Sequence, residues 1–178
     1  MPCSAHETVQ DRLEIWDVHR RQRVTTLRPA GGAGFGRFSP DGRFGTVSDL
    51  RGRVQVFATA TWKPVTPSFA GGRPAWAAFT HGGRTLATGN TDGTVCLWDV
   101  ASGQAPGAPL PGIPNMQVVP IFTPDDTHLI AAYQNGRAYR WDIRPASLVR
   151  QACEVAGRRL TRAEWHEFLP GRAYAPAC

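Results

Sequence analysis

The sequence has few of the features that mark secreted, membrane or redox proteins. Only four cysteines occur in 178 residues, and they lie too far apart to form a disulfide-rich framework, so we expect a reducing, cytoplasmic setting. No stretch approaches the roughly 20 consecutive apolar residues that a membrane span needs. The N-terminus, MPCSAHETVQ, lacks the apolar core of a signal peptide. These absences argue against a membrane protein and against a secreted one.

Lysine is almost absent. Lys63 is the only lysine among the 20 lysine and arginine residues, and the formal net charge is +6. The arginines are scattered along the chain, with short groups only at 20–23 and 158–159. Nucleic-acid binding requires basic side chains that cluster in space, and this spacing does not indicate such a cluster. We therefore interpret the arginines as solvent-exposed and do not expect a nucleic-acid partner.

Signatures of enzymes are also scarce. The glycine-rich stretch GGAGFG at 31–36 does not fit G-x-G-x-x-G, and no Gly-Lys-Ser/Thr follows it. We interpret this stretch as a turn. Asp125 and Asp126 are paired carboxylates, but they occupy a turn position of the repeat described below. The sequence therefore predicts no catalytic residue and no cofactor, and hence a protein that is not an enzyme.

Three residues near the C-terminus could in principle converge on a metal ion: Cys153, His166 and Cys178. They include no C-x-x-C pair and no fourth ligand at typical spacing, whereas structural zinc takes four ligands. We predict no metal site and interpret these residues as a buried thiol and a histidine on a helix surface. The alternative is a Cys153–Cys178 disulfide in an oxidising compartment.

Three marks recur along the chain at a spacing of about 41 residues. One is an aromatic residue at the end of an apolar strand, whose successive members lie 41, 41 and 43 residues apart. The second is the turn sequence FSPDGR, FTHGGR or FTPDDT, and the third is a glycine before each aromatic strand. Three marks in register indicate a repeated structural unit. The aromatic residues are Trp16, Phe57, Trp98 and Trp141, and the glycines are Gly52, Gly93 and Gly136.

Each repeat is predicted to form four short strands joined by tight turns. In the third repeat we expect strands over 74–79, 85–90 and 94–99, and a weaker fourth strand toward Leu110. The third strand alternates, with Val95 and Leu97 on one face and Cys96 and Trp98 on the other. Because both faces are apolar, each sheet is expected to lie between two neighbouring sheets. We further expect the tryptophans that end the third strands, Trp16, Trp98 and Trp141, to be buried.

Repeats of about 40 to 45 residues that form four strands and end in Trp-Asp resemble WD40 repeats, the blades of a β-propeller. The resemblance covers residues 8–143 and includes three Trp-Asp pairs and one degenerate pair, Phe57-Ala58. The Gly-His that this family carries before its innermost strand is missing. In the third repeat, Asp92, Thr88 and Trp98 match three of the four positions of the family's internal hydrogen-bond network.

The repeats account for only part of a ring. We predict an all-β fold of about thirteen strands, with an incomplete propeller of three to three and a half four-stranded antiparallel blades over residues 1–144. Exposed sheet edges and uncovered blade faces tend to associate. The chain is therefore expected to be the C-terminal part of a larger propeller, or to pair with another chain.

The tail, residues 145–178, is predicted to be helical and to cap the last blade. Thr161 and Glu164 have the spacing of a capping box, and Leu160 and Trp165 flank it as a hydrophobic staple. The stretch ACEVAGRRLTRAEWHEFLPG resembles the ending of WD40-containing regulatory proteins of the actinobacterial type. Terminal units of repeat arrays need such a cap.

The resemblance implies a non-catalytic module for protein-protein interaction, a scaffold that binds a protein or peptide. The alternative that it implies is the sensor or regulatory C-terminal part of an NTP-driven signalling protein of the STAND type, or of a kinase. Partners include a second copy of the chain or the missing blades, but not a membrane. By analogy with the family, the binding residues are the loop residues Arg51, Arg73, Asp92 and Asn135. Trp62 is a further candidate, because its position in a turn favours a contact surface.

Overall fold

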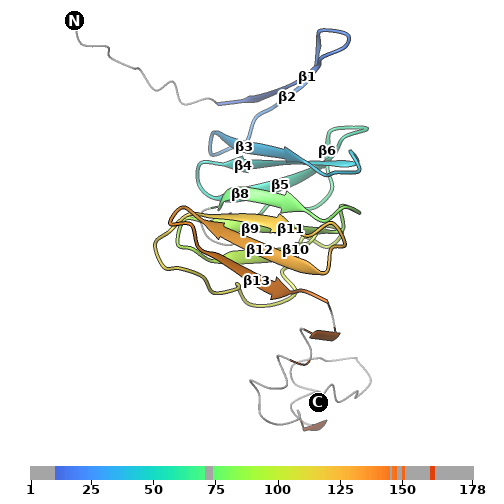
Figure 1. The fold of residues 1–178 in the computed structure, drawn as a ribbon. Coiled ribbons are helices and arrows are strands. Elements are labelled where there is room, and N and C mark those ends of the chain that lie inside the picture. Colours follow the sequence, from blue (N-terminus) through green and yellow to red (C-terminus); the bar gives the residue numbers. More distant parts are fainter. Residues whose placement is uncertain (1–10, 71–73, 145, 148–149, 151–160, 163–178) are drawn as a thin grey trace, which may run out of the picture.

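The computed structural model describes residues 11–70, 74–144, 146–147, 150 and 161–162. The described part is almost entirely β-structure, with thirteen strands in four antiparallel sheets. Figure 1 shows the sheets following one another as a stack from the N-terminal to the C-terminal side. An all-β fold with about thirteen strands was predicted from the repeats, and the structure agrees with both.

Each sheet is named here as a blade, in chain order. Blade A consists of β1 (Leu13–Asp17) and β2 (Gln22–Leu27). Blade B consists of β3 (Ala33–Phe38), β4 (Phe44–Asp49), β5 (Arg53–Ala58), β6 (Lys63–Pro64) and β7 (Phe69–Ala70). Blade C consists of β8 (Pro74–Phe79), β9 (Thr85–Asn90) and β10 (Val95–Asp99). Blade D consists of β11 (Val118–Phe122), β12 (His128–Tyr133) and β13 (Ala138–Asp142).

Blade C follows the sequence prediction closely. The first two strands have the predicted bounds, and the third begins at Val95, one residue later than predicted. The fourth strand is reduced to a single bridge between Val95 and Leu110, with N···O distances of 3.1 and 2.7 Å. In blade B the fourth position holds two short strands, β6 and β7, both paired with β5. Blades B, C and D therefore share their inner three strands and differ at the outer edge, whereas blade A has only two strands.

The core lies between blades and not within a single sheet. One buried cluster joins blades B and C and includes Val56, Cys96 and Trp98. A second joins blades C and D and includes Val95 and Leu129. The two faces of β10 thus pack on different neighbours, as the alternation in the sequence predicts. Blade C is therefore covered on both sides, whereas blade B is covered fully only on the side of blade C.

The interpretation of 31–36 as a turn is wrong over most of its length. Only the backbone bond from Gly32 N to Pro29 O, at 3.1 Å, belongs to a turn. Ala33–Phe38 is β3, the first strand of blade B. Glycine is needed inside this strand because a Cβ at Gly34 would collide with the hydroxyl of Ser48 on β4.

The expectation of burial is wrong for Trp16. Its side chain is 54% exposed, whereas Trp98 at the same position of the third repeat is only 6% exposed. Trp98 faces blade B, but Trp16 lies on the side of blade A that no described residue covers. Trp141 is partly buried against the second core cluster.

The predicted helical tail and its boundary at residue 144 are not tested, because nearly all of 145–178 lies outside the described residues. The same holds for Cys153, His166, Cys178 and Arg73. Within the described part, no helix is long and apolar enough to cross a membrane.

Candidate functional site

The turns of the stack gather at two rims. The first-turn rim holds the turns between the first and second strands of blades B, C and D, at 39–43, 80–84 and 123–127. The second-turn rim holds the turns between the second and third strands, at 50–52, 91–94 and 134–137. Because antiparallel strands reverse direction at every turn, successive turns lie at opposite ends of a blade.

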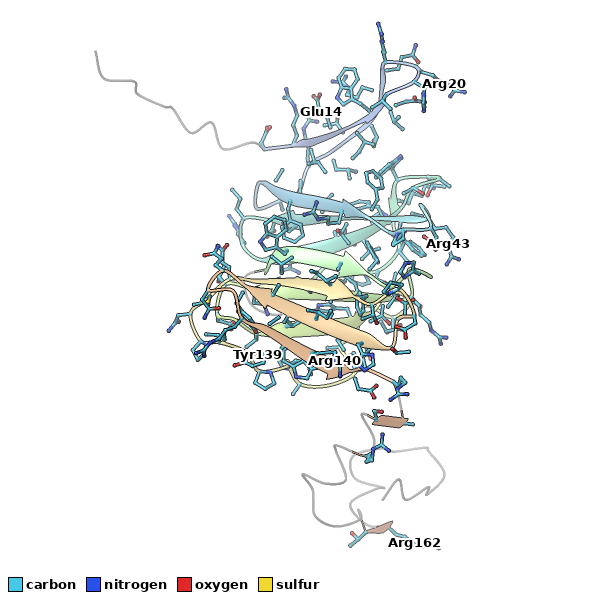
Figure 2. All side chains as sticks on the ribbon, viewed as in Figure 1. Glu14, Arg20, Arg43, Tyr139, Arg140 and Arg162 are labelled. Carbon is cyan, nitrogen blue, oxygen red and sulfur yellow. The ribbon has the colours of Figure 1, made fainter. Side chains whose placement is uncertain are left out.

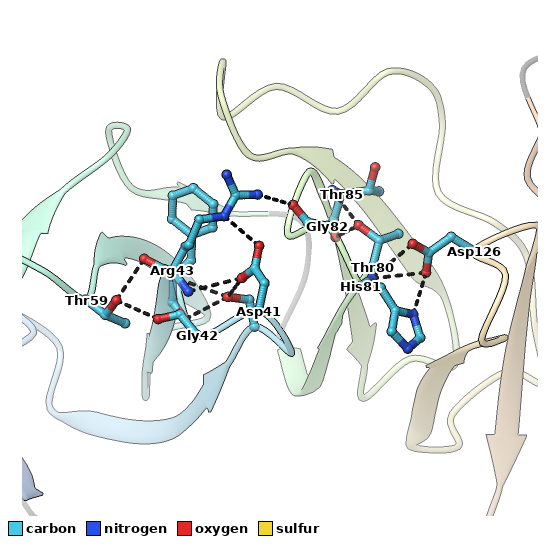
Figure 3. Close-up of polar contacts among 11 residues, drawn as sticks. Asp41, Gly42, Arg43, Thr59, Thr80, His81, Gly82, Thr85 and Asp126 are labelled. Carbon is cyan, nitrogen blue, oxygen red and sulfur yellow. Dashed lines mark hydrogen bonds and ion pairs between the residues drawn. The ribbon is translucent and has the colours of Figure 1, made fainter.

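Polar side chains at the first-turn rim bind to one another (Figure 3). In blade B, Asp41 accepts hydrogen bonds from Ser39 Oγ at 2.6 Å and from Arg43 N at 3.0 Å and Nε at 2.6 Å. These bonds, led by that from Ser39, lower the pKa of Asp41 to about 2. Arg43 also donates to the Gly82 carbonyl at 2.7 Å, so this cluster ties blade B to blade C.

Asp126 makes the corresponding link between blades C and D. Its carboxylate accepts from the backbone N of His81 at 3.0 and 3.1 Å, and His81 Nδ1 lies 3.2 Å from Oδ1. Asp126 has φ of 55° at the turn position that glycines 42 and 83 occupy in the other blades. Aspartate tolerates this left-handed conformation better than most residues. The turn therefore gains a side chain that reaches the neighbouring blade.

Asp125 closes its own turn, as Asp41 does in blade B. It accepts from Thr123 Oγ1 at 2.6 Å and from Thr127 Oγ1 at 2.8 Å. The two threonine hydroxyls are the main cause of its pKa, which is lowered to about 2. The prediction that Asp125 and Asp126 fill a turn is confirmed, and both carboxylates are engaged in structural bonds.

The aspartates of the Trp-Asp pairs cap the turns that follow them. Asp99 Oδ1 accepts from both the N and the Oγ of Ser102, at 2.8 Å each, and these bonds lower the pKa of Asp99. Asp17 accepts from the backbone N of residues 19 and 20 at 2.9 Å. Asp142 accepts from Arg144 N at 3.0 Å. The pair is thus a structural mark that recurs with the blade.

The family's internal network is partial in blade C. Trp98 Nε1 donates to Thr88 Oγ1 at 3.0 Å, deep in the core. Asp92, the third matching position, is exposed and instead accepts from Thr94 N at 2.9 Å and Thr94 Oγ1 at 2.7 Å. The bond from Trp98 to Thr88 therefore fastens β10 to β9, while Asp92 shapes the turn at the rim.

Three of the predicted binding residues lie together on the second-turn rim. Arg51, Asp92 and Asn135 occupy equivalent turns of blades B, C and D, and all three are exposed. Each of these turns contains a glycine with positive φ: Gly52 (86°), Gly93 (92°) and Gly136 (79°). The glycine provides the backbone conformation, while Asp92 and Asn135 also accept hydrogen bonds from residues two positions later, Thr94 and Arg137. Arg73, the fourth predicted residue, lies outside the described residues.

Trp62 does not join this group. It follows the third strand of blade B, so it belongs to the opposite end of the blade. Its φ is 55°, and its ring meets that of Phe38 edge to face with a centroid distance of 6.0 Å. The ring is half-buried and lies beside Gly45 of β4. Trp62 therefore packs mainly on its own blade.

Sequence reasoning missed an exposed aromatic residue on the inner strands. Trp76 of β8 is 37% exposed, and the Arg37 guanidinium lies 5.1 Å from its ring centroid. Arg37 comes from β3, and β8 packs beside both β3 and β11. The signal in the sequence was a tryptophan in the first strand of a repeat, outside the Trp-Asp series.

Two cavities lie between blades A and B. One of about 330 Å³ is lined by Leu27, Asp49 and Arg53, and one of about 230 Å³ is lined by Leu13, Phe38 and Trp62. Both exist because two strands cover only part of the face of blade B. Among the described residues, no group of three or more His, Cys, Asp or Glu side chains could hold a metal ion.

Repeated antiparallel sheets that pack face to face define this protein as an incomplete β-propeller. The family "WD domain, G-beta repeat" matches residues 75–99, which span the three strands of blade C. The crystal structure of the computationally designed Ika4 protein superposes with a TM-score of 0.64 at 19% sequence identity, over 76% of this chain and 82% of that one. These findings fit a partial propeller of WD40 repeats.

The structural likeness concerns the fold alone. As many as 1056 chains of solved structures match, so the likeness identifies a widely shared architecture and no single activity. No curated protein matches the sequence significantly. A WD40 repeat on a propeller-like fold suggests a scaffold for protein interactions.

Proposed function

We propose that this protein is a non-catalytic interaction module whose second-turn rim binds a protein or peptide. The observation that carries the proposal is the alignment of Arg51, Asp92 and Asn135 in equivalent exposed turns. The repeat places one of these three residues on each of blades B, C and D, and their side chains differ in charge and in hydrogen-bonding capacity. Such a row suits recognition of an extended segment that crosses several blades.

The contrast between the two rims supports this choice. At the first-turn rim the polar side chains bind to one another and hold adjacent blades together. At the second-turn rim the Arg51 guanidinium, one carboxylate oxygen of Asp92 and the Asn135 amide nitrogen make no hydrogen bond with any described residue. These groups are therefore available to a partner without loss of an internal bond.

Charge indicates the chemistry of the partner. Arg51 on blade B would bind a carboxylate, and Asp92 on blade C a lysine or arginine. A segment with an acidic and a basic residue at matching spacing is the simplest ligand. Arg73 remains a predicted contributor, whereas Trp62 would require a separate contact at the opposite end of blade B.

A catalytic role is not proposed, because four of the carboxylates in the turns already have structural partners. Asp41, Asp99, Asp125 and Asp142 all cap turns or bind neighbouring side chains. The same binding rim would serve the alternative assignment, in which the propeller senses a ligand for an NTP-driven or kinase signalling protein.

Peptide selection tests the proposal. Peptides selected from a random library on the full chain would be synthesised, and their Kd measured by fluorescence anisotropy. We expect the combined variant Arg51→Ala, Asp92→Asn and Asn135→Ala to weaken binding at least about tenfold, because hydrogen bonds to charged groups contribute about 1.5–3 kcal/mol each. Lys63→Ala, an exposed change on β6, is the matched control. Selected peptides that bind the triple variant and the original chain equally would contradict the assignment to this rim.

A further inference from the structure

Two blade faces remain uncovered by described residues, one at each end of the stack (Figure 1). Blade C packs on a neighbour at both faces. Blade B packs on blade C at one face, and at the other it is partly covered by blade A, whose Leu13 side chain lies beside Gly36. The outer faces of blades A and D have no such neighbour among the described residues. The repeat register allows each uncovered face to be compared with the equivalent covered face of another blade.

The open face of blade D carries Ile121 and Arg140. They stand 43 residues after Ala78 and Leu97, which pack in the cluster between blades C and D. Ile121 is 46% exposed. The face of blade D that turns away from blade C is therefore of the kind on which a following blade packs.

The open face of blade A corresponds to a face that packs on the preceding blade, not on the following one. Trp16 and Val18 stand 82 residues before Trp98 and Val100. Trp98 and Val100 are 6% and 3% exposed because they pack on the preceding blade, whereas Trp16 and Val18 are 54% and 79% exposed. Blade A thus presents the aromatic face that in this fold covers a preceding blade.

We propose that a second copy of the chain covers these faces, with blade A of one copy packed on blade D of the other. The interface between blades B and C is the template, since there the face of blade C that carries Trp98 lies against the face of blade B that carries Val56 and Phe69. A large exposed indole beside an exposed valine is the type of surface that protein partners bury. This inference does not depend on the proposed binding at the second-turn rim.

Charge favours this pairing. In the repeat register Arg140 takes the place of Val56, and Glu14 takes the place of Cys96. Val56 and Cys96 share the buried cluster between blades B and C. Arg140 and Glu14 would therefore both enter the new interface with opposite charges, and an arginine at such an apolar position needs a partner of opposite charge.

Glu14 and Arg140 cannot meet within one copy, because they lie toward opposite ends of the stack (Figure 2). In the single chain Glu14 accepts from Arg12 at 3.2 Å and from Arg23 at 3.3 Å, both at the surface. A cation from another copy would thus join a carboxylate that is already fixed in position.

The number of sheets favours a closed pair. A contact between unlike faces closes into a ring or continues as a filament. The described residues form four sheets, so two copies would supply twice that number, within the range of four to eight blades at which propellers usually close. A second copy is the one occupant that would cover the open faces of blades A and D together.

Sedimentation of the full chain tests this proposal. We expect a species of about twice the 19.4 kDa chain mass at micromolar concentration. Arg140→Glu and Glu14→Arg should each weaken association at least about tenfold, since like charges would then face each other. The two changes combined should restore much of it. Lys63→Glu on β6, away from both faces, is the control, and circular dichroism verifies that each variant folds.

Several results would overturn the proposal. A monomer at all concentrations would do so, as would a dimer that both charge changes leave intact, or a series of ever longer assemblies. A monomer whose Ile121→Cys variant resists maleimide labelling would assign the face of blade D to the segment 151–178 of the same chain. Restoration of the dimer by the combined charge reversal is the result that supports the pairing.

Discussion

Trp98 and Trp16 occupy the same position of two repeats, but their replacement by alanine should have very different costs. Trp98 is 6% exposed, stacks on Phe69 with a centroid distance of 4.3 Å and donates to Thr88 at 3.0 Å. Its loss should lower the free energy of unfolding by about 3–5 kcal/mol, the usual cost of removing a large aromatic side chain from a core. About 1 kcal/mol of this comes from the lost hydrogen bond.

Trp16 is 54% exposed, and its indole donates only to the surface residue Glu14, at 3.2 Å. With about half of the ring in water, Trp16→Ala should lower the unfolding free energy of the single chain by about 1 kcal/mol. If two copies pair as proposed, the larger effect of this change will appear in the dissociation constant.

Urea unfolding followed by circular dichroism measures both costs, because tryptophan fluorescence would itself change in these variants. The protein is kept below its dissociation constant, since association adds to apparent stability. Similar urea dependence (m-value) in the variants and the original chain would verify that they unfold in the same way. Equal losses for Trp16→Ala and Trp98→Ala would refute the reasoning that burial in this fold depends on the neighbouring blade.

Two further predictions concern the turns. Gly93 has φ of 92°, and a Cβ there would overlap the Ile113 carbonyl, so Gly93→Ala should lower the free energy of unfolding by more than about 2 kcal/mol. Gly136 has φ of 79° but open space around it, so Gly136→Ala should lower the free energy of unfolding by only about 1–2 kcal/mol, through backbone strain. Urea unfolding measures both losses. The folded-state pKa values of Asp41 and Asp125, about 2, lie below the ordinary 3.8, so their stabilising bonds should persist above about pH 4 and be lost as the pH falls toward 2. Carboxyl titration by NMR that gives values near 4 would contradict this.

Features that rest on contacts within one repeat could be predicted from the sequence. Alternation and turn glycines are local signals, and they predicted the bounds of β8 and β9. The Trp-Asp pair was correctly interpreted as structural, because Asp99 binds only three residues further along, at Ser102. The co-location of Arg51, Asp92 and Asn135 on one rim also follows from the register alone.

Contacts between repeats could not be predicted in this way. The bond from His81 to Asp126 and that from Arg43 to the Gly82 carbonyl join turns that are about 40 residues apart in sequence. No local pattern specifies which side chain reaches the next blade. From the sequence Asp126 is only a turn residue at a position that is glycine in the other repeats. Its hydrogen bond with His81 of the neighbouring blade is seen only in the structure.

Predictions from local composition were wrong where a residue on another strand determines the conformation. Glycines indicate a turn when only the local chain is considered, yet Gly34 lies inside β3 because the Ser48 hydroxyl occupies the space of a side chain. Trp62 suggested an exposed contact because it lies in a turn, yet its ring is half-buried against Phe38 and Gly45 of blade B. In both cases the deciding residue lies on an adjacent strand of the same blade.

Residues that hold the blades together and residues that are free to bind a partner lie at different rims of this fold. At the first-turn rim a change in Asp126 would release a link between blades, so that position is tied to stability. At the second-turn rim the glycine satisfies the backbone, and the side chain before it is arginine, aspartate or asparagine in different blades. Because these side chains are exposed and Asp92 and Asn135 bond only within their own turns, recognition can differ from blade to blade while the contacts between blades remain the same. For that reason we assign binding to the rim whose side chains have the fewest internal partners.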